Sequence, residues 1–302
     1  MRRIFLGVLF VLATVLVLGD AVGGEKRFER KFSVSPGGVL TLQTDRGSVT
    51  VTGTAGNEVV VQARMEGRDK DIEKFAIEAS QTAGGVEVTG KGPKDFWRFL
   101  RGIEFDVEFT VSVPKDYNVH LHTSGGDVRV SQLKGKVDGG TSGGDVILKQ
   151  IEGPTMVETS GGNIEVEGVK GTIHAETSGG DVRLKTVTGD VHAETSGGNI
   201  GVEDVEGKVQ VETSGGNVVV KVRGANKGVH AETSGGNVTI AIGKTVGALI
   251  DASTSGGDVI CDLPVTVSGK ISDSHIKGTA NGGGELIYAH TSGGNIRIKS
   301  LE

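Results

Sequence analysis

The chain has 302 residues, a formal net charge of −6, one cysteine and 51 glycines, and only 4% of its residues are aromatic. A mildly acidic chain is a poor partner for nucleic acid or anionic lipid, so neither is expected as the main ligand. A single cysteine cannot form an internal disulfide, so the fold must be stable without one. Cys261 is best interpreted as a small buried hydrophobic residue.

Residues 1–21 have the organisation of a secretory signal peptide. Two arginines precede an apolar run at 4–18, and the small residues Gly19 and Ala21 follow it. The run is short for a membrane-spanning helix, and no cysteine follows it that could carry a lipoprotein anchor. The sequence predicts an exported protein, in the periplasm, at the cell surface or secreted, with no stable membrane span after cleavage. The alternative is a segment retained as an N-terminal anchor.

Residues 25–118 show irregular strand patterns and most of the aromatic side chains. Alternation of apolar and polar residues predicts strands at 39–44, 48–51, 58–62, 85–88 and 105–111. Two stretches, 44–47 and 82–85, resemble decayed versions of the corner described below. We therefore expect a bulkier start of the same architecture that caps its first coil. The cluster Phe96, Trp97 and Phe99 is either a hydrophobic flap over that coil or an exposed anchor for a protein, glycan or membrane partner.

Residues 119–302 form a repeat. Thr-Ser-Gly-Gly occurs nine times, at intervals of mostly 18 residues, and is always followed by Asp or Asn and then Val or Ile; the copies begin at 123, 141, 159, 177, 195, 213, 233, 254 and 291. So short a period predicts stacked copies of one unit, with alternating strands on either side of a glycine corner. The fold class is therefore all-β, a parallel β-solenoid of about 18-residue coils, right-handed by the usual crossover rule.

Aliphatic residues recur at three positions of this unit and predict three inward columns. They include Val119, Val137 and Ile173 before the corner, Leu148 and Leu184 after it, and Ile151 and Val187 on a third short side. The threonine before each corner also faces inward and is expected to form a hydroxyl ladder. Ser272–Ile276 lies 18 residues after Thr254 and resembles a degenerate corner, which would make ten coils in this part.

The phrase at 109–119, Phe-Thr-Val-Ser-Val-Pro-Lys-Asp-Tyr-Asn-Val, leads directly into the repeated Ser-Gly-Gly-Asp-Val units. In this the chain resembles the bacterial "putative adhesin" family of β-strand-repeat proteins, a domain of unknown function related to adhesin-head domains. The resemblance covers residues 28–302. It implies an exported β-solenoid and carries no catalytic residues over to this chain.

Two outward columns carry the candidate site residues. Acids precede five consecutive corners: Glu158, Glu176, Glu194, Glu212 and Glu232. Like charges one coil apart are destabilising, and His174, His192 and His230 lie two residues earlier on the same face, where protonated histidine could offset them. Carboxylate and imidazole are also a common metal-ligand pair. The alternative is repeat duplication, with the glutamates simply solvated.

The polar residues recur in columns and do not converge, so no nucleophile, base and orienting group stand out. The sequence thus predicts a non-catalytic, adhesin-like scaffold or binding module with an unknown protein or glycan ligand and no cofactor. Two alternatives remain: a polysaccharide-active β-helix enzyme, and a cation- or pH-responsive sensor of the cell envelope. Self-association through exposed strand edges of the terminal coil is a further expectation.

Overall fold

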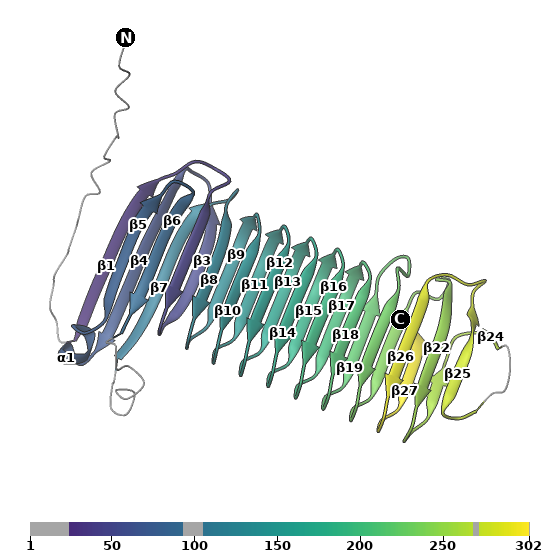
Figure 1. Cartoon of the computed structure of the whole chain (residues 1–302). Coiled ribbons are helices and arrows are strands. Elements are labelled where there is room, and N and C mark those ends of the chain that lie inside the picture. The colour runs from purple at the N-terminus through teal and green to yellow at the C-terminus, as the bar shows by residue number, and fades with distance from the viewer. Residues whose placement is uncertain (1–23, 93–104, 268–271, 302) are drawn as a thin grey trace, which may run out of the picture.

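The computed structural model describes residues 24–92, 105–267 and 272–301. Its strands form two long sheets, sheet A and sheet B, that face each other along a rod (Figure 1). In spatial order, sheet A consists of β1 (Glu25–Ser33), β4 (Glu58–Gly67), β7 (Phe105–Pro114), β3 (Ser48–Thr54), β9 (Val128–Lys134), β11 (Val146–Glu152), β13 (Ile164–Lys170), β15 (Val182–Thr188), β17 (Ile200–Glu206), β19 (Val218–Val222), β21 (Val238–Ile242), β27 (Ile296–Ser300) and β23 (Val259–Cys261).

Sheet B lies opposite sheet A and is built the same way. In spatial order it consists of β24 (Val265–Val267), β25 (His275–Ala280), β22 (Ala248–Thr254), β26 (Leu286–Thr291), β20 (Val229–Thr233), β18 (Val209–Thr213), β16 (Val191–Thr195), β14 (Ile173–Thr177), β12 (Thr155–Thr159), β10 (Val137–Thr141), β8 (Asn118–Thr123), β2 (Val39–Thr44), β6 (Gly85–Lys91) and β5 (Ala76–Thr82). The short helix α1 (Asp69–Ile72) follows β4. The all-β solenoid predicted from the repeat is thereby confirmed.

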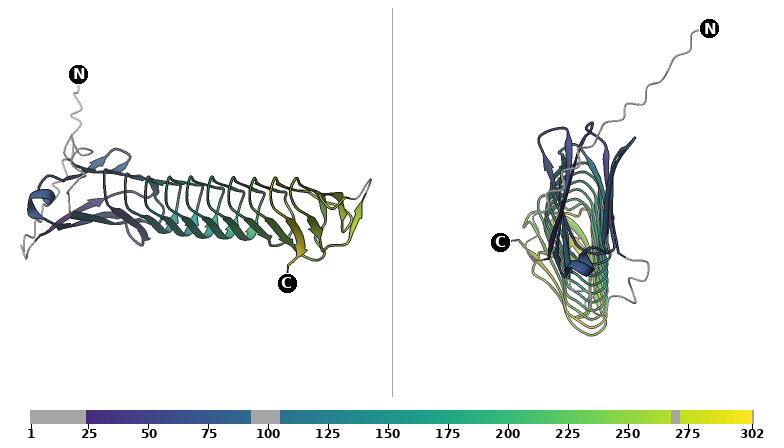
Figure 2. Two further views of the ribbon diagram at one scale, coloured as in Figure 1. Left: turned by 90° about the horizontal axis from the view of Figure 1, so that it is seen from below. Right: turned by 90° about the vertical axis from the view of Figure 1, so that its left-hand side faces the viewer.

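Each regular coil has two sides. A five-residue strand in sheet B passes through the Thr-Ser-Gly-Gly corner into a strand of sheet A, and Figure 2 shows the resulting flat tube end-on. The third side expected from the sequence is the end of the sheet A strand, which bends at a left-handed residue such as Gln150, φ 57°, or Thr186, φ 56°. The coil is therefore flattened and not three-sided.

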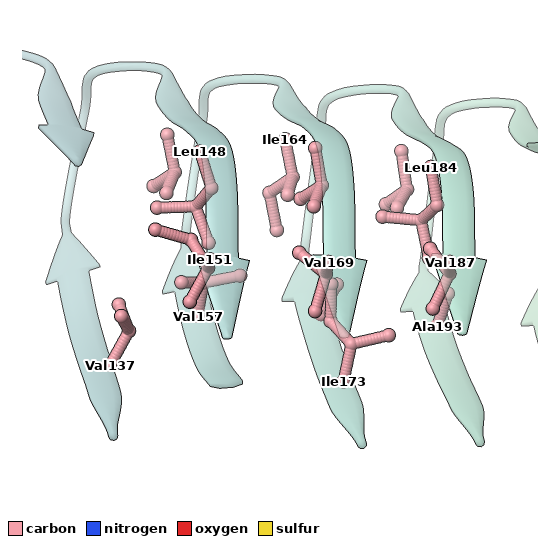
Figure 3. Packing of buried hydrophobic residues seen from close by; sticks show 14 of the residues in the cluster. Val137, Leu148, Ile151, Val157, Ile164, Val169, Ile173, Leu184, Val187 and Ala193 are labelled. Carbon is pink, nitrogen blue, oxygen red and sulfur yellow. The ribbon is translucent and has the colours of Figure 1, made fainter. Parts of the chain in front are cut away.

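The three inward columns are confirmed. Parallel pairing places Ile173 opposite Val191, Leu184 opposite Val202 and Val187 opposite Val205, so equivalent residues stack from coil to coil. All of these side chains are buried, and Figure 3 shows Ile173, Leu184 and Val187 among the residues that pack between the two sheets. Since burial contributes about 25 cal/mol per Å² of apolar surface, these columns are the main source of stability.

The corner is held by threonine and glycine in a way that the sequence did not reveal. The hydroxyl of each threonine does not join a hydroxyl ladder; Thr195 Oγ1 donates to the carbonyl of Gly180 in the preceding coil at 2.9 Å. A Cβ on Gly180 would lie 1.9 Å from the carbonyl oxygen of Gly162, one coil below. The second corner glycine is thus required by close stacking and, from Gly144 to Gly294, has no positive φ; only at the first corner, in Gly126, is φ positive, at 115°.

The residue after each corner forms a second link between coils, here called the Asx ladder: Asp127, Asp145, Asn163, Asp181, Asn199, Asn217, Asn237, Asn295 and Asp258, in spatial order. The Oδ1 atom of each accepts the backbone N–H of the next, as in Asn217 N–H to Asn199 Oδ1 at 2.9 Å. Through its Oδ1, each of these residues thus bonds the corner backbone of the neighbouring coil. Asp and Asn both offer this oxygen, which explains why they interchange.

The N-terminal coils are not stacked in sequence order. The coil of β2 and β3 lies between the coil of β6 and β7 and that of β8 and β9. Antiparallel strands then close this end, β4 and β1 on sheet A and β5 on sheet B. Residues 82–85 form the hairpin turn between β5 and β6, so their interpretation as a decayed corner is wrong. The stretch 44–47 does join β2 to β3.

The C-terminal end repeats this arrangement. The last coil, β26 and β27, lies between the coil of β20 and β21 and that of β22 and β23. Ser274 and Asp273 do lie against the preceding corner, accepting the N–H groups of Thr254 and Val259. However, β25 then runs antiparallel to β22, so the tenth coil predicted at 272–276 is wrong. The C-terminal coil is thus paired on both sides, β26 with β20 and β22, and β27 with β21 and β23. Self-association through a terminal coil stays a prediction.

Candidate functional site

The outer face of sheet B carries the glutamate and histidine columns. Pairing in register places Glu158, Glu176, Glu194, Glu212 and Glu232 on five neighbouring strands, as the sequence suggested. The parallel column reads His120, Asp138, Met156, His174, His192, Gln210 and His230. Each strand shows only these two outward residues between its buried ones, so the face is two side chains wide.

The histidines contact the glutamates directly. His192 Nε2 lies 2.8 Å from Glu194 Oε1, and His230 Nε2 lies 3.0 Å from Glu232 Oε1. The rings of His174 and His192 also stack, with centroids 4.6 Å apart and planes at 6°. Protonation would strengthen each His–Glu pair but would place like charges on two stacked rings. The face therefore has a built-in competition between attraction to the carboxylates and repulsion between the rings.

The inserted C-terminal coil extends this face with residues that sequence order does not place there. Tyr288 stacks on His230, with centroids 4.7 Å apart, and is followed in the column by Asp251. Burial, with the charges of Glu232 and Asp251, raises the pKa of Tyr288. The hydrogen bond from Lys277 lowers the pKa of Asp251. Sequence reasoning missed these neighbours because it stacked the coils in chain order.

The geometry does not gather metal ligands at these columns. Across residues 24–92, 105–267 and 272–301, no three side chains of His, Cys, Asp or Glu are placed to hold a metal ion together. His174, His192 and His230 each contact the one carboxylate of their own strand, and these His–Glu pairs lie one or two coils apart. The metal-ligand prediction for Glu158, Glu176, Glu194, Glu212, Glu232, His174, His192 and His230 thus gains no support from their arrangement.

The outer face of sheet A contains a groove that the sequence did not suggest. It has a volume of about 610 Å³ and extends over β13, β15, β17 and β19. Gly201 is one of its lining residues, at a position where the neighbouring coils carry Arg183 and Val219. The Asx ladder flanks it on one side. On the other side runs a column in which acidic and basic residues alternate, and in which Lys221 Nζ lies 2.6 Å from Glu203 Oε1.

The aromatic cluster and the single cysteine were also singled out from the sequence. Phe96, Trp97 and Phe99 lie outside the described residues, in the segment that joins β6 to β7. Cys261 stacks on Ile298 and is only partly buried, and burial raises the pKa of its thiol. Within the described ranges, no helix is both long enough and apolar enough to span a membrane.

A family model described as Toastrack DUF4097 matches residues 39–299. The chain belongs to this family. The match begins at β2 and ends within β27, so both out-of-order end coils of this Toastrack chain fall inside it. No curated protein matches the chain.

Solved structures also resemble this Toastrack chain. A "putative cell adhesion protein" from Clostridium sporogenes is 16% identical, with 91% of this chain and 100% of that chain covered and a TM-score of 0.22. "Putative adhesins" from Bacteroides fragilis and Parabacteroides distasonis are 13% and 10% identical. Both have a TM-score of 0.44, with 91% of this chain and 97% of the other covered. At such identities the likeness says nothing of a shared ligand.

Proposed function

We propose that this protein is an exported, non-catalytic binding or scaffold module of the cell envelope. The observation that carries the proposal is that the central coils, from β10 to β18, have no long loops. From β10 to β18, every strand of five or seven residues passes into the next through a short corner or turn. Enzymes need side chains that converge from different directions on one reacting atom. Here polar side chains repeat at fixed positions, which suits a rigid surface that displays the same groups along its length.

The signal-like segment at 1–21 supports the exported location, and the uninterrupted rod supports a scaffold or adhesive role. The test is fractionation of cells that express the full chain with a C-terminal tag, with mass spectrometry of the mature N-terminus. The purified chain from residue 25 is then incubated with polysaccharides and assayed for released reducing ends. Export with processing near Ala21 and no release of reducing ends is expected. A cytoplasmic, unprocessed chain would refute the location, and sustained release of reducing ends would favour the β-helix enzyme.

A second function, a pH-responsive envelope sensor, is favoured by the His–Glu contacts on sheet B. Histidine changes charge between about pH 5 and 8. His192 faces Glu194 on its own strand, and the stacked ring of His174 and the carboxylate of Glu176 on β14. On β18 it faces Gln210 and Glu212. Because glutamates outnumber histidines here, acidification should stabilise the face overall.

The measurement for this second function is the melting temperature at about pH 7.5 and 5.5, with EDTA, Ca²⁺ or Zn²⁺. The expected result is a rise at the lower pH that is smaller in Glu194→Gln. Glu206→Gln, which removes an exposed carboxylate from sheet A, is the matched control and should behave like the parent chain. An equal response of all three proteins would leave these columns as solvated repeat surface. A metal-dependent rise lost in Glu194→Gln would restore the metal interpretation.

A further inference from the structure

Gly201 is a glycine that the fold does not require. Glycine within a strand is unfavourable unless it permits a bulge, a bend or the close approach of another group. Its φ lies outside the left-handed region, and a Cβ built on it would meet no atom within 4 Å. The second corner glycines, by contrast, are held against the next coil. This residue lines the groove on sheet A, between Arg183 and Val219 of the neighbouring coils.

From Gly201 the groove passes along the solenoid axis into a surface strip without net charge, which extends past the groove's last lining strand, β19, to β21. Gly201, Val219 and Thr239 follow one another in register and form its floor. One wall is the part of the Asx ladder where three amides succeed one another, Asn199, Asn217 and Asn237. The other wall begins with the Glu203–Lys221 pair, whose charges neutralise each other at 2.6 Å.

The amide wall presents a row of fixed donors. The Oδ1 of Asn199 accepts both the backbone N–H and the Nδ2–H of Asn217, and the Oδ1 of Asn217 accepts the same two groups of Asn237. Each side-chain amide carries two N–H groups, so one N–H of each asparagine is left for a ligand. These donors recur at the coil spacing of about 4.8 Å. Their orientation is fixed before binding, which lowers the entropic cost of association.

Charged groups of both signs stand at the β13 and β15 end of the groove. Arg183 contacts Asp181 at 2.6 Å, whereas Lys185, Glu165 and Glu167 make no ion pair or side-chain hydrogen bond with other described residues. A ligand of a single charge sign would meet repulsion from one of these groups. A hydroxyl can donate to a carboxylate and accept from an ammonium group or an amide, so it suits all of them.

We propose that this strip is a binding site for a neutral oligosaccharide that lies along the solenoid axis. A pyranose ring sits over Gly201, with its C–H face against Val219. Its hydroxyls contact the amide wall on one side and the Lys185 and Glu203 side chains on the other. The proposal rests on the proposed function as a binding module, and it names the ligand class.

The test uses isothermal titration calorimetry of the mature chain with cellotetraose, chitotetraose and maltotetraose, and with tetragalacturonate as a charged comparison. At least one neutral tetrasaccharide should bind, and more tightly than tetragalacturonate. Gly201→Val should weaken binding at least tenfold, because the side chain fills the floor of the groove. Its melting temperature should be unchanged or higher, since valine favours strands and meets open space here.

Gly140→Val is the matched control. Gly140 is a strand glycine on the outer face of sheet B, and a Cβ there would meet its nearest atoms at an ordinary 3.6 Å; binding should be unaffected. Asn217→Asp keeps the oxygen that the ladder needs, as Asp181 shows in its own coil, but removes the free donor, and should also weaken binding.

Three results would overturn the site: no neutral tetrasaccharide bound below about 10 mM, equal affinity for tetragalacturonate, or full binding by Gly201→Val. Each would leave an exported, non-catalytic chain possible, because export and the reducing-end assay are measured separately.

Discussion

Replacing Gly180 with alanine tests the idea that the coil spacing, and not backbone φ, requires the second corner glycine. The added Cβ would lie 1.9 Å from the carbonyl oxygen of Gly162, whereas such contacts essentially never fall below 3.0 Å. The two coils would have to separate by about 1 Å at this corner. The adjacent Gly179 is the matched control, because its Cβ would have no neighbour closer than 3.6 Å.

The cost follows from the hydrogen bonds that join the two coils at this corner. Thr177 Oγ1 donates to the carbonyl of Gly162 at 2.9 Å, the N–H of Asp181 donates to Asn163 Oδ1 at 2.9 Å, and the N–H of Gly179 donates to a carbonyl of the coil below at 3.1 Å. A shift of about 1 Å takes all three beyond hydrogen-bonding distance. At about 0.5–1.5 kcal/mol each, the loss is about 2–4 kcal/mol.

Urea unfolding followed by circular dichroism measures this difference, with a check that the transition is two-state, since repeat proteins can unfold in parts. Gly180→Ala should lose about 2–4 kcal/mol. Gly179→Ala should be within about 1 kcal/mol of the parent chain, or more stable because its unfolded state has less freedom. Equal effects of the two substitutions, or a neutral Gly180→Ala, would refute the stacking argument.

Three other predictions concern single side chains. Thr195→Val should cost about 1–2 kcal/mol in the same assay, because the carbonyl of Gly180 loses its hydroxyl donor; an unchanged midpoint would contradict that bridge. Tyr117→Phe should keep or raise the melting temperature, since the buried hydroxyl has no partner among the described residues; a loss above about 1 kcal/mol would show that it has one. The backbone N–H of Asn199 lowers the pKa of Asp181, so Asp181 stabilises the fold above its unfolded pKa of about 3.9 and loses this effect as the pH falls through its folded value. The melting temperature should thus fall below about pH 4, and fall less in Asp181→Asn.

The coil and its core were predictable because they depend on local order. Alternation around Ile173 and Leu184 fixes which side chains face inward, and strict spacing fixes which residues stack. The corner bonds depend on atoms that meet only after stacking, so the sequence could identify Gly180 and Asn217 as corner residues without giving their partners. The groove could not be predicted for the same reason, because it is formed by Gly201 together with residues of three other coils, which become neighbours only after stacking.

The order of the end coils has a different physical origin. Every parallel coil presents the same corner and the same columns, so Asn295 fits the Asx ladder between Asn237 and Asp258 as well as it would fit at the end. The segment that follows β23 decides whether the last coil lies between two others or at the end of the rod. This segment turns back as the antiparallel strand β25, which pairs with β22, and the chain then returns as β26 between β20 and β22.

This arrangement protects both ends of the rod. A parallel solenoid that ended in a full coil would expose two strand edges, which can pair with another molecule. Here β23 and β24 are only three residues long at one end. At the other end, β1 and β5 run antiparallel to their neighbours and carry exposed polar residues. The described ends therefore offer short or antiparallel strand edges in place of a full parallel coil.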